Sequence, residues 1–549
     1  MGRRASASAR GAARRWIDEN VLELGRELRL SFLPPLMVYL AAGVSGLTAI
    51  VGTFFVKEYL GLSAEFLAGL AFWAGIPWAL KMPLGHLVDL IWRHKAALVY
   101  VGAGLIAAGL LIMLGLLRDP EAMRTVLPAE AWYVIAALLS PVGYVVQDVV
   151  ADAMTVEAVP RRDEQGRPID PALRKRMNTT VQTLGRVAIL GGGVLVSLVN
   201  VIMFQDTESL PQADKAAIYA RIYAMALVIP AVSVLGVALA RWLRGREARR
   251  LRAQGLDDAA VRRAQDPGGA ATEPNWWILG GSLVFAAISL SIGLSELELG
   301  QELVFAGSLS VIVFLMTKIL RELEPDARRT LVGTALLIFV FRALPGPGAG
   351  ATWWMIDVLG FDQAFLAKLS LIASGLTLAG LFVFRRFMAD RSIATIVGTL
   401  SVAGFALGLP IVGMVYGLHD WTAARTGGIV DARFIALVDT ALESPLGQIA
   451  MVPMLAWIAN SAPARLKATY FAVMASFTNL ALSASQLGTK YLNQLFVVTR
   501  QVTDPATGAV TVPAHYGELG VLLVTASALS LALPFAAIGL AKLLGLRSA

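Results

Sequence analysis

The feature that most constrains this chain is an apolar block of about 20 residues that recurs along its length. A helix of that length crosses a hydrocarbon core of roughly 30 Å and satisfies its own backbone polar groups. Fourteen blocks can be counted: a group of six, a shorter pair and a second group of six. They lie near 33–56, 65–83, 96–117, 130–155, 178–203, 217–241, 276–294, 302–320, 329–357, 364–385, 391–417, 430–458, 466–496 and 517–543.

Composition supports a membrane protein. Hydrophobic residues make up 56% of the chain and charged residues 16%, whereas soluble domains have about 45–50% and about 25%. We therefore predict an all-α polytopic membrane protein with 14 transmembrane helices. Its predicted parts are an N-terminal tail (1–32), a six-helix half (33–242), a polar linker (243–275), two inserted helices (276–320) and a second six-helix half (321–545).

The basic residues between the blocks predict the topology. Lys- and Arg-rich loops such as "IWRHK" and "APARLK" alternate with less basic ones such as "SELELGQE", and basic loops stay in the cytoplasm. Both termini are then cytoplasmic, which agrees with an even number of helices. The tail is basic and amphipathic and lacks a signal peptide's cleavage pattern, so we expect it to be retained. The net charge of +8 follows from this topology and does not indicate nucleic-acid binding. We expect a multi-pass protein of the inner (cytoplasmic) membrane, in contact with the lipid bilayer.

The two groups of six blocks resemble each other. "FFVKEYLGLSAEFLAGL" from Phe54 and "WWMIDVLGFDQAFLAKL" from Trp353 share several residues in register, and "SPVG" at Ser140 matches "SPLG" at Ser444. Transporters built from two six-helix repeats show such similarity. The short pair has no counterpart, which indicates an insertion.

The sequence lacks the residues on which several classes of protein function depend. The chain has no cysteine and four histidines, and no Gly-x-x-x-x-Gly-Lys-Ser/Thr loop for ATP phosphates. We therefore predict no metal site, no cofactor and no enzymatic activity, since no nucleophile or metal constellation is evident.

The stretch that follows the second block, "GHLVDLIWRHK", contains Gly85, Asp89 and Arg93. It resembles the loop between helices two and three of the major facilitator superfamily, in which a glycine permits a tight turn and an acid and a base latch the two halves. The resemblance implies a gating loop here, although the usual glycine before the basic pair is missing.

Within that superfamily the first two blocks are most similar to the folate-biopterin transporter family. The similarity rests on an aromatic-x-Lys-acid, a Leu-Gly-Leu-Ser, a Pro-Trp-x-x-Lys-x-x-x-Gly and an Asp-Val-x-x-Asp pattern. These patterns comprise Phe55, Lys57, Glu58, Leu60 to Ser63, Pro77, Trp78, Lys81, Gly85, Asp148 and Asp152. The resemblance implies a folate or pterin substrate. Fourteen helices and "QDVVADA" also resemble muropeptide permeases and acetyl-CoA transporters of the same superfamily.

Two aspartates interrupt the fourth block. Asp148 and Asp152 are four residues apart, so they share one helical face, and ionisable groups at membrane depth point into the bundle or a wet cavity. Asp148 is expected roughly 27 Å along a helix that starts outside, in the cytoplasmic half. Arg186 is the nearest basic partner by sequence. A structural clasp, proton coupling and substrate contact remain the alternatives.

A second charged set is expected nearer the membrane midplane. It consists of Arg342 in helix seven and of Asp439 and Glu443, again four residues apart, in helix ten. Pro345 and Pro347 should break helix seven just after Arg342, beside a cavity. Arg342 is expected to hold the substrate's anionic group or an acid on helix ten, or to form an ion pair that only fixes packing.

These observations predict a secondary active transporter that moves a small organic anion, with folate or pterin as candidates, by alternating access with proton coupling. Its partners are then a small-molecule substrate and protons. The alternatives are a muropeptide or acyl-CoA-type permease, or a transport-inactive membrane sensor or assembly factor with the same fold.

Overall fold

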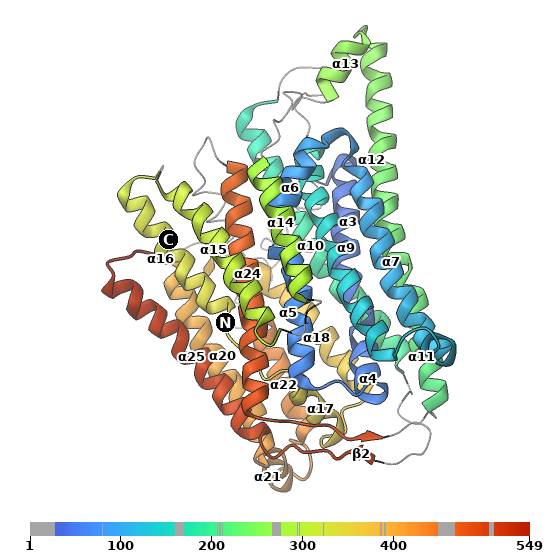
Figure 1. Ribbon diagram of the computed structural model, residues 1–549, viewed down its shortest axis with the longest axis vertical. Coiled ribbons are helices and arrows are strands. Elements are labelled where there is room, and N and C mark those ends of the chain that lie inside the picture. The colour runs from blue at the N-terminus through green and yellow to red at the C-terminus, as the bar shows by residue number, and fades with distance from the viewer. Residues whose placement is uncertain are drawn as a thin grey trace, which may run out of the picture.

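The computed structural model describes residues 28–548 apart from 80, 160–168, 206, 208–209, 211, 266–275, 294, 296, 322, 385–386, 389–390, 448, 450–466 and 504–509. This part is almost entirely helical, and most of its helices run along the same axis (Figure 1). Every predicted block contains at least one helix. Nine helical stretches within the described residues are long and apolar enough to cross a membrane. The all-α membrane fold is therefore confirmed, whereas the number fourteen remains a prediction.

The first half is helical through all six of its blocks. Its elements are η2 (Leu30–Phe32), α3 (Leu33–Gly43), η3 (Val44–Thr48), α4 (Ala49–Tyr59), α5 (Ala64–Ala79), α6 (Lys81–Leu90), η4 (Trp92–His94), α7 (Ala96–Arg118), α8 (Pro120–Arg124), α9 (Ala129–Ala158), α10 (Pro171–Met203), α11 (Gln212–Ala226) and α12 (Val228–Ala253). The connecting and inserted helices are α13 (Asp258–Gln265), α14 (Trp276–Gly293) and α15 (Gly300–Leu320).

The second half adds a small β-hairpin to its helices. Its elements are α16 (Pro325–Arg342), α17 (Ala349–Asp357), α18 (Gln363–Val383), α20 (Ile393–Val415), α21 (Leu418–Arg425), α22 (Ala432–Glu443), η6 (Ser444–Leu446), α24 (Lys467–Leu495), β1 (Val502–Thr503), β2 (Val510–Val512) and α25 (Leu519–Leu543). The strands pair antiparallel, with Val502 opposite Val512.

We name the two ends of the bundle by what they carry. The hairpin end carries β1 and β2, and the linker end carries α13 (Figure 1). α12 reaches the linker end as a helix that continues to Ala253, eleven residues past the predicted boundary at 242. Alanine, arginine and leucine are strong helix formers, which explains the continuation. The helix ends where Gly255 adopts φ +86°, a left-handed conformation that favours glycine.

The two groups of helices meet along two seams. At one seam α5 packs against α24, and at the other α10 packs against α18. Ser197 of α10 lies within hydrogen-bond distance of Ser370 (2.8 Å) and Ser374 (3.2 Å) of α18. Short hydroxyl side chains permit such close helix packing and supply a polar contact inside the bundle.

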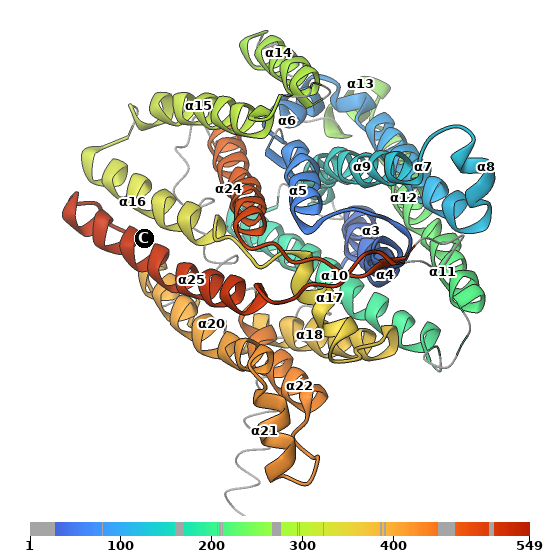
Figure 2. The same ribbon diagram turned by 60° about the horizontal axis from the view of Figure 1, so that its bottom comes forward.

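The inserted helices lie at the side of the bundle. α14 contacts α6, and α15 contacts both α5 and α24, so the insertion covers the α5–α24 seam (Figure 2). Glu302 of α15 accepts a hydrogen bond from the Tyr491 hydroxyl and lies 3.6 Å from the Lys490 ammonium, both on α24. These contacts tie the insertion to the second half.

Candidate functional site

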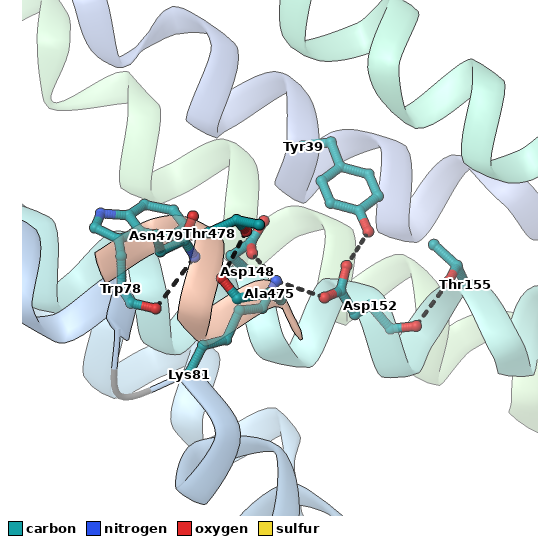
Figure 3. A network of polar contacts seen from close by, with 9 residues as sticks. All are labelled: Tyr39, Trp78, Lys81, Asp148, Asp152, Thr155, Ala475, Thr478 and Asn479. Atoms are coloured by element: carbon teal, nitrogen blue, oxygen red, sulfur yellow. Dashed lines mark hydrogen bonds and ion pairs between the residues drawn. The ribbon is translucent and has the colours of Figure 1, made fainter. Parts of the chain in front are cut away.

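Lys81 lies between the two aspartates of the fourth block (Figure 3). Its Nζ is 2.5 Å from Asp148 Oδ2 and 2.7 Å from Asp152 Oδ2. The aspartates share one face of α9 because they are one helical turn apart, and Lys81 is the first residue of α6. The side chains of Lys81 and Asp148 are only 18% and 15% exposed. One cation therefore pairs with two carboxylates, of which Asp148 is largely buried and Asp152 is 40% exposed.

Asp152 is also held from two other helices. The Tyr39 hydroxyl of α3 donates to Asp152 Oδ1 at 2.6 Å (Figure 3). The Thr155 hydroxyl donates to the Asp152 carbonyl at 2.6 Å, and Gln182 of α10 donates to that hydroxyl at 3.0 Å. We call Lys81, Asp148, Asp152 and Tyr39 the lysine cluster. It joins three parts of the first half: α3, the α5–α6 helix pair and α9.

The structure places Lys81, and not the expected Arg186, in ion-pair contact with the two aspartates. Arg186 lies within electrostatic range of Asp148, but no ion pair joins it to either aspartate among the described contacts. Arg186 was expected because it lies on α10, the helix that follows α9 in the sequence. In the structure, α6, which forms the linker-end part of the second block, packs against α9. A signal for Lys81 was present: it is a lysine within an apolar block, and such residues are functional by default.

The lysine cluster adjoins the seam between the two halves. Asn479 of α24 donates from Nδ2 to the Trp78 carbonyl at the end of α5, at 3.2 Å (Figure 3). One residue earlier on α24, the Thr478 carbonyl accepts a hydrogen bond from Arg342 Nε at 3.0 Å. Arg342 and Arg186 are close enough for their charges to repel each other. A basic residue of α16 and one of α10 thus lie within electrostatic range of each other.

Helix seven is broken after Arg342, as predicted. α16 ends at Arg342, α17 begins at Ala349, and Gly348 between them has φ +75°. α24 satisfies the freed backbone groups: Gly346 N donates to the Thr489 hydroxyl at 2.9 Å, and the Ser485 hydroxyl donates to the Leu344 carbonyl at 2.6 Å. The break therefore packs against α24, which supplies partners for its backbone, and irregular backbone is tolerated at membrane depth where protein supplies them.

Asp439 and Glu443 are the acids predicted near Arg342. Among the described ion pairs none joins either of them to Arg342, so their grouping remains a prediction. Asp439 Oδ1 is buried and has no hydrogen-bond partner among the described residues, and Glu443 is exposed. The described residues contain no group of three His, Asp or Glu side chains that could hold a metal ion.

The predicted gating loop is only partly described. Gly85 lies inside α6, and no atom lies within 4 Å of the position that a Cβ would take there, so it does not form a tight turn. The turn follows at Ile91–Lys95, and the side chains of Asp89 and Arg93 lie outside the described residues. Nearby, Lys95 Nζ is 2.5 Å from Glu157 Oε1 of α9 and 3.8 Å above the Trp92 ring. This ion pair fastens the loop to helix four.

A second group of polar side chains connects the two halves at the hairpin end. Arg500, which follows α24, is 3% exposed and donates three hydrogen bonds to backbone carbonyls around the end of α4. The acceptors are the carbonyls of Val56 (2.9 Å), Lys57 (2.9 Å) and Leu62 (2.7 Å). The guanidinium lies 4.6 Å from the Trp353 ring centre. Arg500 thus bonds to carbonyls of the last turn of α4 and of the segment that follows it.

Ion pairs and hydrogen bonds reinforce this contact. Lys57 Nζ of α4 is 2.5 Å from Asp357 Oδ1 of α17, and the Tyr516 hydroxyl donates to Asp357 Oδ2 at 2.5 Å. Burial and the hydrogen bond to Asp357 raise the pKa of Tyr516 well above its usual range, so the hydroxyl keeps its proton. We call Lys57, Asp357, Arg500 and Tyr516 the hairpin-end latch. It joins helix one to the second half (Figure 2).

Comparison with known proteins supports the predicted resemblance. Residues 300–544 match the model of the BT1 family. The folate-biopterin transporter of Synechocystis sp. is 22% identical over 471 residues, which cover 85% of this chain and 75% of that protein. The match extends over both halves, whereas the predicted motifs lay mostly in the first.

Solved transporters share the fold at low sequence identity. A POT family transporter in complex with 5-aminolevulinic acid has a TM-score of 0.59 and 11% identity, covering 93% of this chain and 96% of that one. A peptide transporter POT in complex with sulfate has a TM-score of 0.57 and 15% identity, covering 94% of each chain. The nucleoside transporter NupG has a TM-score of 0.51 and 12% identity, covering 93% of this chain and 99% of that one.

The fold and the relatives together indicate a transport protein with a small-molecule substrate, not an enzyme, as predicted. Residues 300–544 match the BT1 family model, and the chain is a multi-pass membrane transport protein with the major facilitator fold, similar to the folate-biopterin transporter of Synechocystis sp..

Proposed function

We propose that this protein is a proton-coupled secondary transporter that moves a folate- or pterin-type organic anion by alternating access. The relative named a folate-biopterin transporter supports the substrate class. The observation that carries the proposal is a set of charged side chains between the helices. Lys81 pairs with Asp148 and Asp152, and Arg342, which is hydrogen-bonded to α24, lies within electrostatic range of Arg186. Buried ionisable groups of transporters mark substrate and proton pathways.

The two arginines provide the anion-binding side of the site. The two positive charges repel each other in a low-dielectric interior. A substrate carboxylate bound between them would attract both and so offset this repulsion. Because Arg186 lies on α10 and Arg342 on α16, an anion held by both draws the two six-helix halves, 33–242 and 321–545, together. Substrate binding then favours closure of the central site.

The lysine cluster provides the coupling side. Asp148 and Asp152 both depend on Lys81 for compensation, so protonation of one carboxylate weakens its hold on the lysine. A proton that enters the cluster thus loosens the contact between α6 and α9 at the linker end. Asp439, whose buried oxygen has no partner among the described residues, is a second candidate proton carrier with Glu443.

In the orientation that we propose, the linker end faces the cytoplasm and the hairpin end faces outward across the inner membrane. Both termini are then cytoplasmic. The loop with Gly85, Asp89 and Arg93 belongs to the cytoplasmic gate, and the hairpin-end latch is the outer gate. The inserted helices, 276–320, cover the α5–α24 seam from the lipid.

Uptake of labelled folate and biopterin by purified protein in liposomes tests the function. Arg342→Lys keeps the charge but loses the planar fork that binds a carboxylate through two bonds. We expect folate affinity to fall about tenfold, equivalent to about 1.4 kcal/mol. Wild-type affinity in that variant would remove Arg342 from the site. Binding without uptake in the wild type would favour a sensor, and competition only by muropeptides or acyl-CoA would favour those permeases.

The coupling role is tested separately with Asp148→Asn, because an amide keeps the size of the carboxyl group but cannot carry the proton. We expect this variant to lose uptake driven by a pH gradient and to retain exchange of substrate down its own gradient. Arg342→Lys, assayed in parallel, should retain coupling despite weaker binding. Proton-driven uptake at the wild-type rate in Asp148→Asn would contradict the coupling role.

A further inference from the structure

A cavity of about 420 Å³ lies in the hairpin-end part of the bundle, and the residues of the lysine cluster are not among those that line it. Its wall comes from both halves: η3, α4, α5, α7, α9 and α11 of the first half and α17 of the second. None of the described side chains that line it carries a charge. This volume falls within the range of small-molecule sites, about 300–1,000 Å³.

The wall combines aromatic rings with hydroxyl groups. Tyr133, Tyr223 and Trp353 supply rings from three different helices, and Thr48 and Ser140 add hydroxyls. Each hydroxyl both donates and accepts hydrogen bonds. Such a wall suits a flat, uncharged ring with polar edges, because the faces meet aromatic surface and the edge atoms find partners.

The same wall is unsuited to a carboxylate. A buried anion without a cation is costly, and no cation lines the cavity among the described residues. Arg342 supplies the cation on the other side of the helix-seven break: Ala349, which lines the cavity, follows Arg342 by seven residues. An extended ligand that passes the break would meet an uncharged compartment on its α17 side and a basic side chain on its α16 side.

We propose that this cavity binds the uncharged heteroaromatic ring of the substrate, while its carboxylates bind at Arg342 and Arg186. The inference rests on the proposed function and assigns the two parts of the ligand to two compartments. The hairpin-end latch borders the ring compartment, because Val56 and Trp353 both line the cavity and both contact Arg500. The ring therefore lies next to the gate that we assign to the outer side.

Two glycine-to-leucine substitutions, one on the cavity wall and one outside the cavity, test whether the ring and the carboxylates bind in different compartments. Gly52 lines the cavity, and a Cβ there meets only the Tyr223 hydroxyl, at 3.8 Å, so Gly52→Leu fills the cavity without a backbone clash. Gly104 on α7 is exposed, and no atom lies within 4 Å of a Cβ there. Gly104→Leu is therefore the matched control, with the same change in size and helix propensity away from the cavity.

Uptake of labelled folate in liposomes is then challenged with two competitors. Biopterin has the ring and no carboxylate, whereas p-aminobenzoylglutamate has the carboxylates and no pterin ring. We expect Gly52→Leu to raise the half-inhibitory concentration of biopterin at least tenfold and to leave that of p-aminobenzoylglutamate unchanged. Arg342→Lys should show the opposite pattern, and Gly104→Leu should match the wild type.

Equal weakening of both competitors in Gly52→Leu, or no weakening of biopterin, would overturn the assignment. Should Gly52→Leu fail to fold, Tyr133→Phe removes one wall hydroxyl at constant shape, and the same selective loss of biopterin competition is expected, several-fold in size. Unchanged competition by biopterin in Tyr133→Phe would then overturn it. If wild-type protein neither takes up folate nor responds to either competitor, the proposed function itself fails, which is a distinct result.

Discussion

At the scale of single residues, the charge of Lys81 makes it possible for two aspartates to lie side by side on α9. Two carboxylates one helical turn apart repel each other, and burial makes their ionised forms still less favourable. The ammonium group lies within 2.7 Å of both, which lowers the cost of burying Asp148 beside Asp152. Tyr39 donates a hydrogen bond to the remaining oxygen of Asp152. Loss of Lys81 would leave the two carboxylates without this cation.

Removal of the lysine should therefore be costly. Loss of one partner from a buried ion pair typically destabilises by about 3–5 kcal/mol, because the other charge is left uncompensated. We expect Lys81→Met to lower the melting temperature of the detergent-solubilised protein. Adding Asp148→Asn to that variant should recover part of the loss, since one unpaired carboxylate disappears. Additive losses in the double variant would show that the two residues act independently.

At the scale of secondary-structure elements, the contacts that join the halves differ between the two ends. At the seam near the lysine cluster the described contacts are single hydrogen bonds to backbone, such as Asn479 to the Trp78 carbonyl. At the hairpin end, Arg500 makes three such bonds to the end of α4 and stacks on Trp353 of α17. The segment after α24 therefore acts as a strap between helix one and the second half.

Arg500→Gln should loosen this strap. Glutamine cannot reach three carbonyls or stack as a cation on Trp353, so the hairpin end should open more often. Accessibility can be measured with Ala74→Cys, which places a thiol on the cavity wall of a chain without other cysteines. We expect a membrane-impermeant maleimide to label this thiol several-fold faster when Arg500→Gln is also present. Equal labelling rates with and without Arg500→Gln would exclude a latch role.

At the scale of the whole molecule, the two halves and the insertion form one bundle whose ends differ in charge. The linker end carries the basic continuation of α12, with Arg246, Arg249 and Arg252 exposed. The hairpin end carries the β-hairpin and α21 (Figure 1). Because basic segments are retained in the cytoplasm, this asymmetry favours an inward linker end.

Single cysteines test that orientation. Arg249→Cys lies on the linker end and His515→Cys beside the hairpin, at its bridge to Thr499. In intact cells an impermeant maleimide should label the cysteine at 515 and leave the one at 249 unlabelled until the membrane is permeabilised. Labelling of position 249 in intact cells would invert the proposed topology.

Much of the architecture could be predicted because it depends on local physics. Apolar blocks of membrane length predict helices wherever they occur, and the break after Arg342 follows from Pro345, Gly346 and Pro347. The shared face of Asp148 and Asp152 follows from their spacing alone. Each of these inferences needs only residues that are close together in the chain.

Partners that come from distant helices could be decided only by the tertiary structure. By sequence Arg186 was the nearest base to Asp148 and Asp152, but packing of α6 on α9 makes Lys81 the partner. Likewise, nothing local indicates that Arg500 bonds to the end of α4, a helix more than 400 residues earlier. The amino-acid sequence determined the helices and their charges by itself, because these depend on local periodicity and composition. Which charges meet depends on how the helices pack, and packing is a property of the whole chain.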